Sequence, residues 1–221
     1  MPHFILNFHG IGHPPPSVGA DERHYWVPEG QFDACLDIVC QARSPIGITF
    51  DDGNESDYAV AFPRLKSRSI PALFFVLTDR IGKPGSLSAE QLAEIASAPG
   101  YAVGSHGKAH KAWTSLSDAD LEREARGSRE TLEGLLDKKI DQAGLPFGRY
   151  DRRTLRALAQ AGYREVYSSD GGPRLSSLWP TPRMSVRQDT DIATIAHRIG
   201  QASRPGARFA TEARALLKSL R

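Results

Sequence analysis

The sequence has neither a strong excess of one charge nor a long apolar run. Lysine and arginine number 28 against 26 acidic residues, so the 221-residue chain carries a net charge of only +2. A dedicated nucleic-acid binder usually has a clear basic excess, and we therefore expect no nucleic-acid partner. A membrane-spanning helix needs about 20 consecutive apolar residues. No stretch approaches that length, so we expect no transmembrane segment.

Signal-peptide features and cysteine are also scarce. The first residues, MPHFILN, contain neither a charged leading region nor a long apolar core, so no signal peptide is expected. Cys35 and Cys40 are the only cysteines, and their spacing in a helical pattern turns them to different faces. We predict two buried free thiols rather than a disulfide. These features together favour a cytoplasmic location.

Short apolar runs typical of strands alternate with stretches typical of helices. The strand candidates are Phe4–Phe8, Ile46–Phe50, Ala72–Leu77, Tyr101–Gly104, Gln142–Pro146, Glu165–Ser168 and Arg183–Val186. The helix candidates are Glu29–Gln41, Asp57–Ser67, Ala89–Ala98, Asp118–Leu136, Arg152–Ala161 and Ile192–Ile199. This alternation predicts parallel strands with helices packed outside, in an α/β fold. About seven units indicate a deformed (β/α)7 barrel, smaller than the common eightfold one.

The chain length fits a single domain over residues 1–221. Residues 204–221 read as a C-terminal helical tail whose basic side chains belong to a solvated face or to a face for an anionic membrane surface. A proline-rich loop runs from Pro14 to about Pro28, either as a stiff surface loop or as one wall of a substrate groove.

Three polar motifs follow predicted strands, where the loops of such a barrel place its chemistry. They are ITFDDG at residues 48–53, GSHGKAH at residues 104–110 and LPFGRYD at residues 145–151. Taken singly, each has an ordinary structural explanation as a turn, a helix entry or a loop.

Taken together, the first two motifs predict a metal site. Adjacent carboxylates such as Asp51 and Asp52 can divide their roles, one binding a metal and the other acting as a base. His106 and His110 are four residues apart, so on a helical turn both rings reach one ion. Two histidines and one carboxylate leave coordination positions open for water and substrate, as a catalytic metal requires.

In this order, the motifs resemble those of the polysaccharide deacetylase (NodB-homology) family, carbohydrate esterase family four. That family is characterised by Thr-Phe-Asp-Asp-Gly, then His-Ser/Thr-x-x-His, then Arg-x-Pro-Tyr-Gly. The segments ALFFV at residues 72–76, DGG at residues 170–172 and PRMSV at residues 182–186 extend the resemblance and look like the exopolysaccharide-cluster subgroup. The resemblance covers most of the chain between Ile5 and Val186.

The resemblance implies a deformed seven-unit barrel that hydrolyses acetyl groups from a sugar. Carried over by position, Asp52, His106 and His110 would hold a divalent metal, which we expect to be zinc, with cobalt, nickel or manganese as alternatives. Asp51 would be the base, and the backbone N–H of Phe147 would stabilise the oxyanion. The other predicted substrate contacts are Pro146, Arg149, Trp113 and Trp26. Each tryptophan is equally well explained as core packing.

Three departures from the family pattern bear on this expectation. Gly107 replaces the Ser or Thr of the second motif, and Gly144 stands where the third motif has its arginine. Two alternatives follow: Arg149 or another cation pairs with the base, or Asp51 has a different pKa. No Leu-x-His motif lies near the C-terminus, but the apolar run Ile5–Phe8 ends at His9. Because the first and last strands of a closed barrel are neighbours, we predict that His9 is the general acid, in a circularly permuted arrangement like that of biofilm-polysaccharide deacetylases.

The sequence therefore predicts a deacetylase acting on N- or O-acetyl groups of an acetylated glycan or its precursor. Two alternatives stay open. One is a glycan-binding or scaffold protein with weak or no catalysis, to which the missing arginine lends weight. The other is an amidohydrolase that acts on a small non-sugar amide. The sugar, the linkage, the metal and the oligomeric state are not determined by the sequence.

Overall fold

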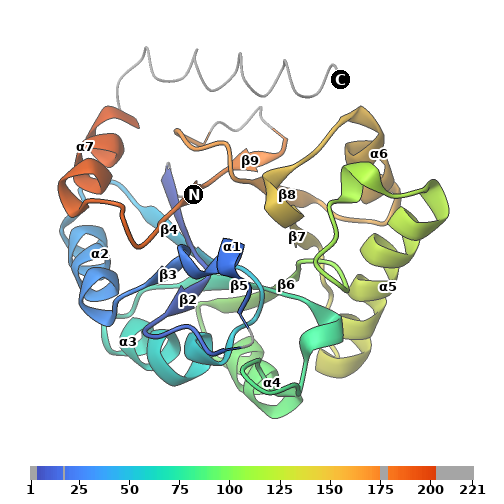
Figure 1. The fold of residues 1–221 in the computed structure, drawn as a ribbon, viewed down its shortest axis with the longest axis horizontal. Coiled ribbons are helices and arrows are strands. Elements are labelled where there is room, and N and C mark those ends of the chain that lie inside the picture. The colour runs from blue at the N-terminus through green and yellow to red at the C-terminus, as the bar shows by residue number, and fades with distance from the viewer. Residues whose placement is uncertain (1–3, 17, 175–178, 203–221) are drawn as a thin grey trace.

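The computed structural model describes residues 4–16, 18–174 and 179–202, and it has parallel strands surrounded by helices (Figure 1). The main sheet contains eight strands in the order β10-β1-β4-β5-β6-β7-β8-β9. Its strands are β1 (Phe4–Phe8), β4 (Ile46–Phe50), β5 (Ala72–Val76), β6 (Tyr101–Ser105), β7 (Gln142–Gly144), β8 (Glu165–Ser168), β9 (Thr181–Pro182) and β10 (Met184–Ser185). All of the strand pairs are parallel. The predicted parallel (β/α) architecture is confirmed.

One extended segment closes the barrel. Its first half, β9, pairs with β8, and its second half, β10, pairs with β1. Arg183 is the single residue between the two halves. The first and last strand positions are therefore neighbours, as the closed-barrel argument for His9 requires.

The helices largely begin where the sequence predicts them. They are α1 (Ala20–Arg23), α2 (Glu29–Gln41), α3 (Phe62–Ser67), α4 (Ala89–Ser97), α5 (Asp118–Leu136), α6 (Arg152–Gln160) and α7 (Ile192–Ala202). Ser88 and Gln91 form a reciprocal capping box at α4, while Ser117 and Asp151 cap α5 and α6. Each capping oxygen satisfies a backbone N–H that has no partner inside its helix.

Several details differ from the sequence prediction. The stretch Asp57–Ala61 is a π-helix that precedes α3, and α7 continues through Gly200 to Ala202. A small sheet of β2 (Gly10–Ile11) and β3 (Trp26–Val27), and the four-residue α1 between them, were not predicted. Cys35 is buried but Cys40 is exposed, so the prediction of two buried thiols is wrong for Cys40. The predicted tail at residues 204–221 lies outside the described residues.

Strand alternation divides the apolar side chains into two groups. Phe4, Leu6 and Phe8 of β1 belong to the large core between strands and helices, whereas Ile5 belongs to a small separate cluster. That cluster also contains Leu73, Phe75 and Tyr167, and it fills the barrel interior because alternate residues of a strand face opposite sides. Asn7 of β1 and Thr49 of β4 are the polar residues at the next inward positions. Asn7 donates a hydrogen bond to Asp51, and Thr49 donates one to Asn7. Within the described residues, no helix is long and apolar enough to span a membrane.

Candidate active site

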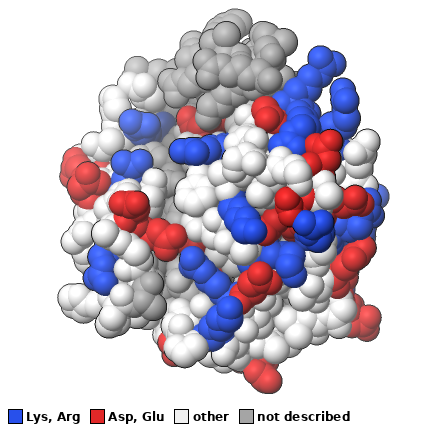
Figure 2. Space-filling model, turned by 45° about the vertical axis from the view of Figure 1, so that its right-hand side comes forward, with Lys and Arg blue, Asp and Glu red and all other residues white. Residues whose placement is uncertain are grey.

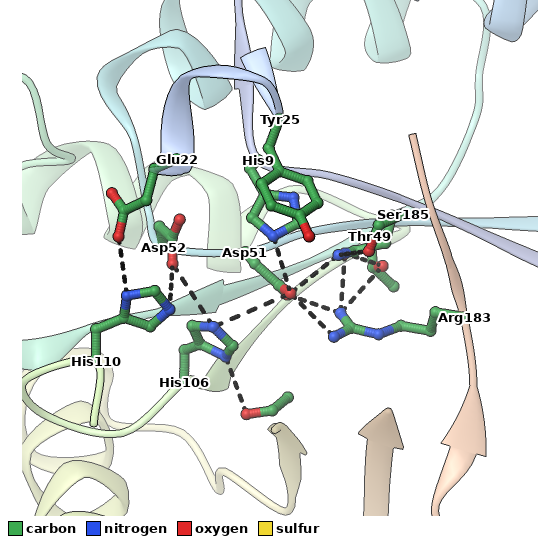
Figure 3. A network of polar contacts seen from close by, with 12 residues as sticks. His9, Glu22, Tyr25, Thr49, Asp51, Asp52, His106, His110, Arg183 and Ser185 are labelled. Carbon is green, nitrogen blue, oxygen red and sulfur yellow. Dashed lines mark hydrogen bonds and ion pairs between the residues drawn. The ribbon is translucent and has the colours of Figure 1, made fainter. Parts of the chain in front are cut away.

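A pocket of about 820 Å³ opens at the carboxyl ends of the strands. His9 follows β1, Asp51 and Asp52 follow β4, and His106 follows β6, so the barrel brings distant motifs together. All four line the pocket, and His110 joins them from the loop after His106. The predicted metal ligands, base and acid therefore lie around one cavity (Figure 3).

Asp52, His106 and His110 form a compact donor set. Their ligand atoms all lie within 4.8 Å of one another. Asp52 Oδ1 is 3.6 Å from His106 Nε2 and 3.6 Å from His110 Nε2. These distances leave space for an ion between the three atoms, because metal–nitrogen and metal–oxygen bonds are about 2.0–2.2 Å long.

The backbone at this site is held in an uncommon conformation. Asp52 has φ 77° and His110 has φ 52°, both in the left-handed region that residues with a Cβ seldom adopt. Phe147, at the rim of the same pocket, has φ 58°. Such conformations cost about 1–3 kcal/mol each and persist where surrounding structure enforces them, which is common at functional sites.

The surroundings of these three residues fit a bound cation. Asp52 Oδ1 is buried and has no hydrogen-bond partner among the described residues. His106 Nδ1 lies 2.9 Å from the Gly144 carbonyl, which places the proton on that nitrogen. Nε2 is then unprotonated, and its lone pair is free to bind a metal. Burial lowers the pKa of His106 to about 4, so the ring is neutral at pH 7. An orphaned carboxylate oxygen beside a neutral imidazole is the environment that a divalent metal satisfies.

Asp51 is paired with Arg183 at the centre of the barrel (Figure 3). The guanidinium donates to Asp51 Oδ1 at 2.7 Å and to Oδ2 at 2.9 Å, and Asn7 Nδ2 donates to Oδ2 at 2.9 Å. Burial would raise the pKa of Asp51, but the charge of Arg183, supported by His106 and His9, outweighs burial and holds that pKa well below its usual range. Asp51 is therefore ionised at neutral pH.

Arg183 supplies Asp51 with a cation, which Gly144, at the position of the family's arginine, cannot do. A Cβ at Gly144 would lie 2.9 Å from the Phe75 ring and 3.1 Å from His106 Nδ1, so a larger residue there would displace the site. The Arg183 guanidinium lies 5.0 Å from the centre of the same Phe75 ring and is completely buried. The cation reaches Asp51 from the β9–β10 segment instead of from the end of β7. Arg149, the candidate named from the sequence, lines the pocket, but the cation paired with Asp51 is Arg183.

His9 faces the base across the pocket. Its Nε2 lies 3.9 Å from Asp51 Oδ2, and its ring stacks on Tyr25 with 4.5 Å between ring centres. His9 Nδ1 is buried and has no hydrogen-bond partner within the described part of the chain. Tyr25 therefore holds the ring by its face, and Nε2 is the nitrogen directed at Asp51.

Glu124 supports the loop between the two metal-site histidines. Its carboxylate accepts the backbone N–H of Lys108 at 2.7 Å and that of Ala109 at 3.3 Å. A Cβ at Gly107, which has φ 87°, would lie 2.9 Å from the same carboxylate. Glycine in place of the family's Ser or Thr therefore leaves room for a carboxylate from α5.

The predicted substrate contacts are only partly brought together. Phe147 lines the pocket with 55% of its surface exposed, and its ring stacks on His110 with centres 4.3 Å apart. Pro146 is buried beneath the rim, and Trp26 is 6% exposed beside neighbouring depressions. Trp113 is completely buried in the core, so its prediction as a substrate contact is wrong. It packs behind the His106–His110 loop, against Gly107.

Comparison with known proteins agrees with this geometry. A family model described as polysaccharide deacetylase matches residues 39–166. "Putative polysaccharide deacetylase YxkH" of Bacillus subtilis (strain 168) is 30% identical over 125 residues, covering 57% of this chain and 44% of that protein. "Chitin deacetylase 1" of Cryptococcus neoformans is 23% identical over 148 residues, covering 66% of this chain and 30% of that protein. The chain thus matches less than half the length of these two curated relatives.

Solved structures share the fold. The deacetylase PplD of Streptococcus pyogenes, in complex with acetate, has a TM-score of 0.78 at 20% identity, with 90% of this chain and 98% of that chain covered. IcaB from Ammonifex degensii has a TM-score of 0.75 at 22% identity, with 89% and 96% covered. The family match extends over more than half of the sequence and includes Asp51 and the three residues of the candidate metal site, Asp52, His106 and His110. This chain belongs to the polysaccharide deacetylase family.

Proposed function

We propose that the protein is a metal-dependent hydrolase that removes acetyl groups from a polysaccharide or its precursor. The observation that carries the proposal is the arrangement around Asp52: buried His106 and half-buried His110 face an unsatisfied oxygen of its carboxylate, and an ionised Asp51 lies beside them in the same pocket. This combination supports activation of water next to an acyl group.

Asp52, His106 and His110 would hold the ion. Zinc fits two imidazoles and one carboxylate, and cobalt, nickel or manganese accept the same donor types. When bound, the metal would polarise the acetyl carbonyl and lower the pKa of water. The remaining steps belong to side chains and backbone groups of the protein.

Asp51 Oδ2 faces the pocket and would accept the proton of the attacking water. Arg183 and Asn7 hold this carboxylate in position by hydrogen bonds. The backbone N–H of Phe147 would donate to the oxyanion that forms on the acetyl oxygen. His9 Nε2, 3.9 Å from Asp51 Oδ2, would then protonate the leaving amine or alcohol.

An acetylated glycan is the substrate class that the pocket and the relatives support. The exposed ring of Phe147 at the rim offers an apolar face to a sugar ring or to the acetyl methyl group. Family membership and the chitin deacetylase relative favour a sugar over a small amide. The missing motif arginine favoured a glycan-binding protein with weak or no catalysis. Arg183 weakens that argument, because it gives Asp51 a cationic partner.

The test is acetate release by protein stripped of metal with a chelator and then reloaded with zinc or cobalt. N-acetylated chitooligosaccharides, an O-acetylated exopolysaccharide and a small N-acetyl amide serve as parallel substrates. We expect release from a glycan that depends on added metal and is lost in Asp52→Ala. Release from the small amide alone would favour the amidohydrolase, and glycan binding without acetate release would favour the scaffold.

A further inference from the structure

The short helix α1 lies against the pocket and has no buried side chains. None of its residues, Ala20–Arg23, is buried, although Asp21 and Glu22 line the pocket. The position of α1 therefore depends on polar and ring contacts rather than on apolar packing. One of these contacts reaches the candidate metal site directly.

Glu22 lies within ion-pair distance of the second imidazole of the donor set. Its Oε1 lies 3.2 Å from His110 Nδ1, on the opposite side of the ring from Nε2, which faces Asp52 (Figure 3). The same Oε1 lies 3.8 Å from an Arg80 guanidinium nitrogen. A carboxylate next to Nδ1 keeps the proton on that nitrogen and orients the ring. It also makes Nε2 more basic, and therefore a stronger ligand for a metal.

The two histidines of the site are supported in different ways. His106 is 1% exposed and is held by the Gly144 carbonyl, a backbone group of the barrel. His110 belongs to an irregular loop, and its side chain is 12% exposed. Its ring is held on one face by Phe147 and at Nδ1 by Glu22. The less enclosed ligand thus depends on a side chain from a segment 88 residues earlier in the chain.

We propose that Glu22 is a positioning residue that sets the metal affinity of the site and couples α1 to metal binding. The inference rests on the proposed metal-dependent function, because it concerns the ligand His110. Coupling between two sites is reciprocal. If Glu22 strengthens metal binding through His110, the bound metal must in turn strengthen the hold of His110 on α1.

The experiment measures zinc affinity by competition with a chromogenic chelator, and no substrate is involved. The variants are Glu22→Ala and Glu22→Gln, with Glu130→Gln as the control. Glu130 is an exposed carboxylate on α5, so its substitution removes the same charge away from the pocket. Loss of a carboxylate that orients a metal-binding histidine typically weakens metal affinity by about 10–100-fold. We expect a loss in that range for Glu22→Ala, a smaller loss for Glu22→Gln, and wild-type affinity for Glu130→Gln.

Hydrogen exchange provides the second measurement. In the wild type, zinc is expected to slow exchange at the amides of residues 20–27, and in Glu22→Ala this slowing should disappear. Equal zinc affinity in the wild type and both Glu22 variants would overturn the proposal, and so would an equal loss in Glu130→Gln. Failure of the deacetylase function is recognised separately, as absence of acetate release by the zinc-loaded wild type.

Discussion

The two sides of the pocket are built differently. On the barrel side, Asp51, His106 and Arg183 are almost completely buried and are held by strand ends and by each other. On the opposite side, Glu22 and Phe147 lie on short helical turns and Tyr25 on a turn, and all three are partly or largely exposed. The barrel side carries the proposed base and its cation, while the loop side contacts the proposed ligand His110 and the proposed acid His9 and forms the rim.

The two sides of the pocket therefore differ in how strongly their charged groups interact. Burial on the barrel side removes water and makes the charge of Arg183 decisive for Asp51, since Coulomb interactions strengthen as the local dielectric falls. Contacts on the loop side are screened and individually weaker. Substitutions on the barrel side should therefore have larger effects than those on the loop side, and the predictions below test that order.

Replacement of the base should have the largest effect. Asp51→Asn keeps the size of the side chain but cannot accept the proton, and general base catalysis is typically worth about 10²–10⁴-fold in rate. We expect kcat for acetate release to fall by that factor while zinc affinity stays near that of the wild type. A variant that keeps more than about one tenth of the wild-type kcat would rule out Asp51 as the base.

Removal of the buried cation should act on both stability and pH dependence. Arg183→Met leaves Asp51 buried without its partner, which typically costs about 3–5 kcal/mol of unfolding free energy. Because the folded-state pKa of Asp51 lies below its unfolded value, the ion pair stabilises the protein fully above about pH 4 and less as pH falls through the folded pKa. In Arg183→Met that pKa should rise, moving the acid limb of activity to higher pH.

Urea denaturation and a pH–activity profile measure the two effects. Arg64→Met is the matched control, because Arg64 pairs with Glu29 and Asp33 at the surface with 28% of its side chain exposed. Exposed pairs contribute about 0–1 kcal/mol, so the control should change little. Equal stability losses in both variants would contradict the claim that the buried Arg183–Asp51 pair contributes more to stability than an exposed pair.

Loss of the acid should have an intermediate effect. His9→Ala removes the proton donor proposed for the leaving group but leaves the base and the metal ligands in place. We expect kcat to fall by about 10²-fold, the lower end of the usual range for acid–base catalysis, with zinc content unchanged. Near wild-type turnover with the metal intact would show that another group supplies the proton.

Substitution of Phe147 at the rim of the pocket should have the smallest effect on acetate release. Phe147→Ala removes a stacked ring but keeps the backbone N–H proposed for the oxyanion. Aromatic contacts are worth about 0.5–1.5 kcal/mol, so KM should rise by about tenfold or less while kcat changes little. A large fall in kcat without a change in KM would mean that the ring, rather than the backbone, serves the chemistry.

The difference between the barrel side and the loop side of the pocket also explains which site residues could be predicted from the sequence. Asp51, Asp52, His106 and His9 each follow an apolar run, and in a parallel barrel such positions meet at one end. Arg183 lay in a predicted strand segment, but its partner is 132 residues away and depends on how the barrel closes. Glu22 lies in a four-residue helix, too short to give a periodic pattern. For Trp113 the sequence leaves substrate contact and core packing equally open, because an aromatic residue near a motif looks the same in either role, and the structure shows core packing.

The central claim is that Asp52, His106 and His110 hold one catalytic metal ion. Anomalous diffraction at the zinc edge, from crystals of the zinc-loaded protein, tests it most directly. The account predicts one peak bonded to Asp52, His106 Nε2 and His110 Nε2 at about 2.0–2.2 Å, with at least one coordination position open to the pocket. A zinc-loaded crystal with no peak between these three residues, or with the ion bound elsewhere, would contradict it.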